Sequence, residues 1–60
     1  MYKYFVSYHY SNGVIAGFGH LESEMPGKIT GIEDIRNLAK SIERDFGVTN
    51  VIIINYRLFD

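Results

Sequence analysis

The dipeptide Asn12-Gly13 constrains this chain more than any other short feature, because a strand-like stretch of alternating residues lies on each side of it. Asn-Gly favours a two-residue type I′ turn, in which both residues take a positive φ. The sequence therefore predicts a β-hairpin over residues 2–23. In the tightest form of this turn, Ser11 lies directly opposite Val14.

The turn also sets the pairing of the two predicted strands. It predicts three informative pairs: Tyr8 with Gly17, Val6 with Gly19, and Lys3 with Glu22. The last pair supports the register, because opposite charges that face each other across two strands are favourable. The two glycines leave space beside their partners, so large side chains can lie across it, or another backbone can approach there.

Alternation divides the hairpin into two faces, since successive side chains of a strand point to opposite sides. The first face, which we call the tyrosine strip, consists of Tyr2, Tyr4, Val6, Tyr8, Tyr10, Ile15, Gly17, Gly19 and Leu21. The second face consists of Lys3, Phe5, Ser7, His9, Val14, Ala16, Phe18, His20 and Glu22. Neither face is plainly polar, so the sequence leaves open which of the two a helix covers.

A helix is predicted over residues 31–46. Thr30 and Glu33 match a capping box, in which a hydroxyl and a carboxylate satisfy backbone N–H groups at the helix start. Gly47 ends the helix, because glycine takes the left-handed conformation after a helix with little strain. Apolar residues recur at the three- and four-residue spacing of a helix face: Ile32, Ile35, Leu38, Ala39, Ile42 and Phe46.

Residues 50–58 are rich in β-branched and aromatic side chains and predict a third strand. The whole chain, residues 1–60, then forms a single domain of the α+β class with the order β-β-α-β. We expect a three-stranded antiparallel sheet with one helix packed on one face. The helix returns the chain over the sheet, so the third strand lies beside the first and the spatial order is 2-1-3.

Composition limits the function of a chain of 60 residues. Six Lys and Arg against seven Asp and Glu give a net charge of −1, which disfavours nucleic acid as a partner because it provides little attraction for phosphates. The absence of cysteine excludes disulfides and thiolate metal sites. The longest aliphatic run, residues 51–54, is too short for a bilayer, and residues 1–4 do not match a secretion signal. We therefore expect a cytoplasmic protein without membrane contact.

Three groups of residues could in principle carry chemistry, and none fits. His9 and His20 share a face, but the predicted register separates them by about 13 Å, at about 3.3 Å per residue, which is too far for one metal ion. Ser7 has no histidine with an orienting carboxylate beside it. Residues 17–19 lie inside a strand and lack the context of a phosphate loop. We expect no catalytic, cofactor-binding or metal-binding residue, and no enzymatic activity.

The tyrosine strip predicts an interaction surface, because tyrosine suits surfaces that are buried against a partner while its hydroxyl stays wet. One helix covers only one face of a sheet, and the other face is left as an apolar patch. A chain of this size also gains stability from self-association, so a homodimer is expected. In the alternative reading, the tyrosine rings only cover the sheet and bind nothing. The predicted surface consists of Tyr2, Tyr4, Tyr8, Tyr10, Ile15 and Leu21.

Residues 4–8, 17–19, 32–35 and 50–56 resemble a pattern of short proteins encoded by phages and mobile elements of Gram-positive bacteria. The resemblance covers nearly the whole chain. This group includes inhibitors of host defence, anti-CRISPR proteins among them, which bind a host nuclease or signalling component and lack enzymatic activity. The resemblance implies a small protein-binding inhibitor whose partner is a host protein such as a CRISPR effector. It assigns no individual site residue.

Two alternative functions remain open. Single-strand binders stack bases on exposed sheet aromatics, and this chain has such aromatics. That mode needs basic neighbours, whereas Lys3, Lys28 and Arg57 are interleaved here with Glu22 and Glu24. The other alternative is a structural or regulatory homodimer.

Overall fold

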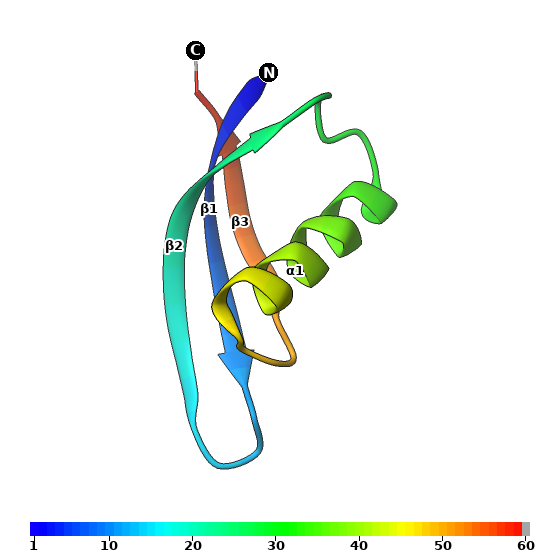
Figure 1. Ribbon diagram of the computed structural model, residues 1–60. Helices are drawn as coiled ribbons and strands as arrows, with labels where there is room; N and C mark the ends of the chain where they lie inside the picture. Colours follow the sequence, from blue (N-terminus) through cyan, green and yellow to red (C-terminus); the bar gives the residue numbers. More distant parts are fainter. Residues whose placement is uncertain (60) are drawn as a thin grey trace.

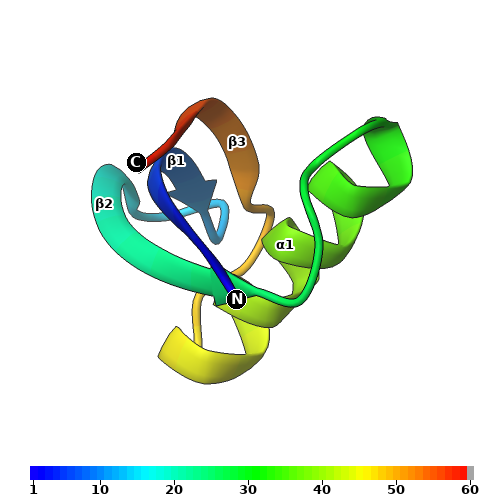
Figure 2. The ribbon, with the colours of Figure 1, turned by 90° about the horizontal axis from the view of Figure 1, so that it is seen from above.

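Four elements follow one another along the chain: strand β1 (Tyr2–Ser11), strand β2 (Ala16–Met25), helix α1 (Ile32–Phe46) and strand β3 (Ile52–Leu58). In the computed structural model, which describes residues 1–59, the strands form one antiparallel sheet in the order β2-β1-β3. This is the predicted α+β fold with the predicted strand order. Helix α1 crosses one face of the sheet, and within residues 1–59 no element lies over the other face (Figures 1 and 2).

The bounds of the elements differ slightly from the predicted ones. The hairpin extends to Met25 instead of residue 23, and β3 begins at Ile52 instead of residue 50. The later start has a backbone cause, because Asn50 has a left-handed φ of 51° and cannot belong to a strand. The Asn50 side chain anchors this loop by donating a hydrogen bond of 2.8 Å to the backbone oxygen of Ser11.

The hairpin turn is longer than the predicted two-residue turn. Gly13 has a φ of 88°, but Asn12 does not have the positive φ that a type I′ turn requires. Instead, the Asn12 side-chain oxygen accepts hydrogen bonds from the backbone N–H groups of Val14 and Ile15, at 2.9 and 2.7 Å. The loop therefore covers residues 12–15, and Ser11 pairs with Ala16.

The longer loop changes the register of the hairpin. The observed pairs include Tyr8 with Gly19, Tyr10 with Gly17, Val6 with Leu21, Phe5 with Glu22, and Lys3 with Glu24. The predicted pairs of Tyr8 with Gly17, Val6 with Gly19, and Lys3 with Glu22 are therefore wrong. Each position is shifted by two residues, and because strand side chains repeat every two residues, every side chain that stays in a strand keeps its face.

Helix α1 covers the tyrosine strip. The buried core consists of Tyr4, Val6, Tyr8, Leu38, Ile42 and Val51. Val6 lies at its centre and is fully enclosed. Burial of an aliphatic or aromatic side chain of this size contributes about 1.5–3 kcal/mol, so these residues supply the main stabilisation of the fold.

The two glycines of β2 make room for tyrosine rings from β1. A Cβ atom built on Gly19 would lie 2.5 Å from Cζ of Tyr8, and one built on Gly17 would lie 2.6 Å from the hydroxyl of Tyr10. The rings therefore lie across the β2 backbone, as the pairing of glycine with a large side chain predicts. The Tyr8 and Tyr10 rings also contact each other, with centroids 6.2 Å apart.

The Tyr4 hydroxyl connects the core to the segment between β2 and α1. It accepts a hydrogen bond of 2.9 Å from the backbone N–H of Ile29. The Tyr4 ring also makes an edge contact with Tyr56 on β3, at a centroid distance of 6.0 Å. A buried tyrosine thus has a partner for its hydroxyl, which removes the penalty of burying a polar group.

Helix α1 begins one residue later than the predicted capping box allows. Gly31 is the N-cap residue, and no side chain caps it. The predicted contact between Thr30 and Glu33 is wrong, because the Thr30 N–H and hydroxyl donate instead to Asp34, at 3.0 and 3.2 Å. Glu33 forms an exposed ion pair with Arg36 at 3.2 Å.

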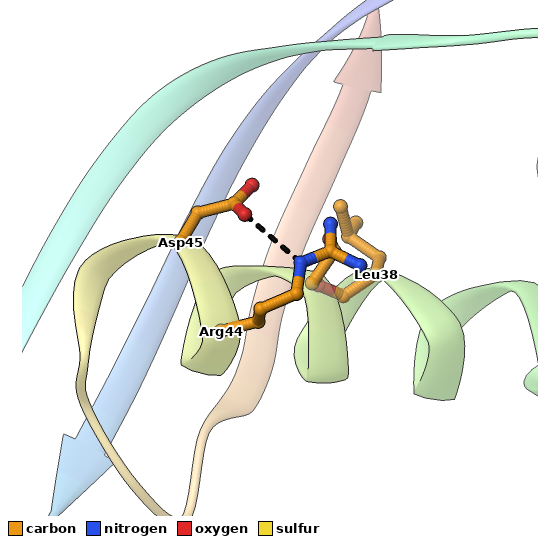
Figure 3. Close-up of polar contacts among 4 residues, drawn as sticks. Leu38, Arg44 and Asp45 are labelled. Carbon is orange, nitrogen blue, oxygen red and sulfur yellow. Dashed lines mark hydrogen bonds and ion pairs between the residues drawn. The ribbon is translucent and has the colours of Figure 1, made fainter.

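Helix α1 ends as predicted at Gly47. This residue has a left-handed φ of 68°, and its N–H donates a hydrogen bond of 3.0 Å to the backbone oxygen of Glu43. Arg44 and Asp45 form an exposed ion pair of 3.1 Å on the last turn (Figure 3). Within residues 1–59, no helix combines the length and the apolarity that crossing a bilayer requires.

Candidate interaction surface

The structure separates the residues that the sequence places on one interaction surface. Tyr4 and Tyr8 lie in the core, with only 3% and 8% of their surface exposed. A partner cannot reach these two side chains in this fold. The other four are spread over several places: half-buried Tyr10 and Leu21 beside the core, exposed Tyr2 at the start of β1, and exposed Ile15 in the hairpin loop. A role for any of them in binding stays a prediction.

The uncovered face of the sheet carries a different set of side chains, which we call the open face. Residues directly opposite each other in neighbouring strands share a face, so the register defines this set. The open face consists of Lys3, Phe5, Ser7, His9 and Ser11 from β1, Ala16, Phe18, His20, Glu22 and Glu24 from β2, and Ile52, Asn55 and Arg57 from β3. Figure 2 shows α1 on the other side of the sheet.

An apolar row crosses the open face near the hairpin loop. It is formed by Phe18, His9 and Ile52, one residue from each strand. Phe18 is 77% exposed and Ile52 is 63% exposed. The Phe18 and His9 rings make an edge contact, with centroids 5.0 Å apart and planes at 67°. Two large apolar side chains therefore face solvent on either side of a histidine.

A charged row crosses the open face near the other end of the sheet. Phe5 lies in its centre, with Glu22 on β2 and Arg57 on β3 directly opposite it. Because neighbouring strands are about 4.8 Å apart, the Glu22 and Arg57 backbones are separated by about 10 Å. The next pair towards the end of the sheet is Lys3 with Glu24. Acidic side chains thus lie on the β2 edge and a basic one on the β3 edge.

These charges have no ion-pair partner in the part of the chain that the structure describes. The two ion pairs there, Arg36 with Glu33 and Arg44 with Asp45, are both on the surface of α1. The opposite-charge pair of Lys3 and Glu24 is a neighbouring pair across two strands, but their charged groups do not come within ion-pair distance. The open face therefore presents separated positive and negative charges to solvent.

Polar residues occupy the row between the apolar and charged rows. Ser7 lies opposite His20 and Asn55 and donates a weak hydrogen bond of 3.5 Å to the Asn55 backbone oxygen. The His20 ring lies 6.0 Å from the Phe5 ring. Among residues 1–59, no group of three His, Asp or Glu side chains is arranged to hold a metal ion, and the surface contains no pocket.

The outer edge of β3 is irregular. Its pairing with β1 passes from Ser7–Asn55 to Tyr8–Ile53, so Ile54 is an extra residue in a β-bulge. The backbone N–H of Tyr56 is occupied as well, because it donates a hydrogen bond of 2.8 Å to the Asn55 side chain. Bulges and occupied backbone groups hinder the addition of another strand to an edge.

The sequence predicted that part of the open face lies on one side of the hairpin, but it did not predict that this side is the exposed one. Phe18, His9 and Phe5 alternate on the second face of the predicted hairpin, but a hairpin with two apolar faces gives no signal for the position of the helix. Ile52 and Arg57 could not be assigned at all, because the bulge at Ile54 changes the alternation of β3.

Comparison with known proteins gives no guide to the function. No family model matches this chain, and no curated protein or solved structure matches it either.

Proposed function

We propose that this protein is a non-enzymatic protein-binding module whose binding surface is the open face. The supporting observation is the apolar row, in which Phe18 and Ile52 are largely exposed. Contiguous exposed apolar side chains on a small protein are typical of interaction sites. The polar and charged rows on the same face supply the polar groups that an interface usually combines with aromatic and aliphatic side chains.

As the target we propose a host defence protein, such as a CRISPR effector, which the chain inhibits by steric binding. This part of the proposal rests on the resemblance of the sequence to phage and mobile-element proteins, and it is independent of the geometry of the open face. The site of action would be the cytoplasm of the host cell.

The test is plasmid interference in a Gram-positive host that carries an active CRISPR nuclease. Expression of the chain should raise transformation by a targeted plasmid towards the level of a non-targeted plasmid. The double variant Phe18→Lys/Ile52→Lys should lose this effect, because two charges then replace the apolar row. The matched control Glu33→Gln/Asn37→Lys raises the net charge by the same two units at exposed positions of α1 and should retain the effect.

Two outcomes would contradict the proposal. Full interference in the presence of well-expressed wild-type protein would contradict the choice of target. Equal inhibition by the wild type and by the double variant, with both chains at the same cellular level, would contradict the open face as the binding surface.

Binding of single-stranded nucleic acid is a second candidate, because the Phe18 and His9 rings lie together on an exposed sheet surface. Two features count against it. Tyr4 and Tyr8 are buried and cannot stack on bases, and Glu22 and Glu24 repel phosphate on the same face. Anisotropy of a labelled oligonucleotide, titrated at low salt, tests this candidate; an unchanged signal at high protein concentration removes it.

A further inference from the structure

We infer that the open face is covered by a second copy of this chain, in a two-fold dimer whose two sheets pack face to face. The inference rests on the proposed function, since it takes the same open face as the binding surface; self-association and target binding then compete for that face. The two-fold axis runs parallel to β1 and lies between the two sheets. Sheets that pack in this way are about 10 Å apart, with strand directions within about 30° of each other.

The distribution of charge on the open face is the main reason for choosing a second copy. A two-fold rotation about an axis parallel to the strands places each row over the same row of the second copy. It also places strand β2 of one copy over strand β3 of the other. Glu22 and Arg57 belong to one row, since both lie opposite Phe5. In the dimer, the acidic edge of one copy therefore lies over Arg57 of the other, and symmetry repeats this contact. The two edges of the face are thus complementary in charge to each other, whereas Lys3 in the central strand faces its own equivalent near the axis.

The apolar row is complementary to itself under the same rotation. Phe18 on β2 lies over Ile52 on β3 of the second copy, and the contact again occurs twice. His9 is in the central strand, so it lies next to the axis and faces its own equivalent. The largest exposed apolar side chains of the sheet are thus removed from water together at the hairpin end of the interface, which is favourable.

A second aligned arrangement, with the two-fold axis perpendicular to the strands, lacks these contacts. A two-fold axis perpendicular to the strands, through the row of Ser7, places each strand over its own equivalent. The order of the rows along the strands is then reversed between the two copies. Glu22 then lies over Phe18 of the second copy, and Arg57 lies over Ile52. Each charge would be removed from water without an opposite charge beside it, which is strongly unfavourable.

Pairing of two sheets through their β3 edges is also disfavoured. The bulge at Ile54 interrupts the regular edge, and the Tyr56 N–H already donates to Asn55. An edge-paired dimer would leave Phe18 and Ile52 exposed as well, because side chains on the face take no part in edge pairing. The face-to-face dimer removes this exposed surface.

The size of the open face predicts a reversible dimer. Three strands about 4.8 Å apart, over about eight residues of about 3.4 Å each, give a flat outline of about 400 Å² per copy. Side chains that stand out from the sheet raise the accessible area above this outline. The accessible surface buried on both copies together is still at the low end for specific interfaces, about 1,000–1,200 Å². Monomer and dimer should therefore exchange with concentration.

The test is sedimentation equilibrium from micromolar to millimolar concentration, with charge reversals on the two edges of the open face. The wild type should show a monomer–dimer equilibrium. The variant Arg57→Glu and the variant Glu22→Arg/Glu24→Arg should each raise the dimer dissociation constant about tenfold or more, because like charges then face each other. An equimolar mixture of the two variants should form a dimer again, since opposite charges meet in the mixed pair.

Matched controls carry the same charge changes on α1, away from the open face. The control Arg44→Glu has the same net charge as Arg57→Glu. The control Glu33→Arg/Asp45→Arg has the same net charge as Glu22→Arg/Glu24→Arg. Each control should dimerise like the wild type, and their mixture should bind no more tightly than either alone. Circular dichroism of every variant, and recovery of the dimer in the mixture, show that the reversals leave the chain folded.

The outcomes separate this inference from the proposed function. A wild-type chain that stays monomeric at millimolar concentration, or a dimer that is insensitive to both reversals, overturns the inference. If such a monomer inhibits interference and Phe18→Lys/Ile52→Lys does not, the proposed function stands alone. A dimer that is lost in each variant and regained in their mixture supports the inference, even if the chain has no effect on interference.

Discussion

The Tyr8 ring occupies the space in which a side chain at position 19 would lie, and residue 19 is a glycine. A Cβ atom at Gly19 would lie 2.5 Å from the Tyr8 ring, far inside contact distance. Tyr8 is itself buried under α1, so its ring has little freedom to move away. Gly17 lies against the hydroxyl end of Tyr10, which is only half-buried.

The substitution Gly19→Ala should lower the free energy of unfolding by about 1–3 kcal/mol, the usual cost of overpacking a core. Gly17→Ala should cost less, because the end of the Tyr10 side chain can shift towards solvent. The matched control is Gly27→Ala, since a Cβ there meets no atom within 4 Å and its φ is not positive. Urea unfolding of the three variants measures these differences. Equal midpoints for Gly19→Ala and Gly27→Ala would contradict the contact with Tyr8.

The substitution Tyr4→Phe removes the acceptor of the Ile29 N–H and keeps the ring. We expect it to lower the free energy of unfolding by about 0.5–1.5 kcal/mol, because a partly buried donor loses its hydrogen bond. Tyr2→Phe is the matched control, since Tyr2 is exposed and should change stability little. Chemical unfolding gives the stability difference, and faster hydrogen exchange of the Ile29 amide would locate it. An unchanged exchange rate in Tyr4→Phe would argue against this bond.

At the scale of elements, the end of α1 determines how the chain returns to the sheet. Gly47 turns the backbone into the left-handed region, and its N–H closes the last turn of the helix on Glu43. The Glu43 carboxylate then accepts a hydrogen bond of 3.0 Å from the backbone N–H of Val51. This bond joins the last turn of α1 to a core residue just before β3.

The substitution Gly47→Ala should destabilise the protein by about 1 kcal/mol, because an alanine at a φ of 68° is strained. A Cβ there meets no atom within 4 Å, so the effect is one of backbone conformation alone. Gly27→Ala again serves as the control without a positive φ. Thermal unfolding followed by circular dichroism gives the comparison. A midpoint equal to that of the control would show that the helix ends differently in solution.

At the scale of the whole molecule, the sheet has one covered and one open face, so the inferred dimer would link association to stability. The covered face holds Tyr4, Val6 and Tyr8 under α1, whereas Phe18 and Ile52 on the open face remain exposed. Only the folded chain can form the inferred dimer, because the open face exists only in the folded sheet. Dimer formation would therefore raise the free energy of unfolding by mass action.

The thermal midpoint of the wild type should rise with protein concentration. The variant Phe18→Lys/Ile52→Lys should show a midpoint that does not depend on concentration, because the face no longer associates. The substituted side chains are exposed in the single chain, so at high dilution the two proteins should differ by only about 0.5 kcal/mol in stability. Calorimetry over a wide concentration range measures both effects. A wild-type midpoint that is constant over this range would contradict the association.

The order of the elements and the end of the helix were predictable from the sequence, because both depend on local signals. Gly47 follows an amphipathic segment and ends it by its own conformational freedom. The hairpin register was not predictable in the same way. Asn12 favours a tight turn, yet its side chain closes a longer loop here, and in the resulting register both Tyr8 and Tyr10 lie opposite glycine.

The exposed surface was less predictable than the fold. The sequence by itself determined which side chains of the hairpin share a face, because alternation survives a register shift of two residues. Only the tertiary structure decided that α1 packs on the tyrosine strip, and that Phe18 and Ile52 are therefore left open. The physical reason is that both faces are apolar enough to form a core. On the covered face, the glycines of β2 leave space for tyrosine rings, and this space exists only when the strands are paired.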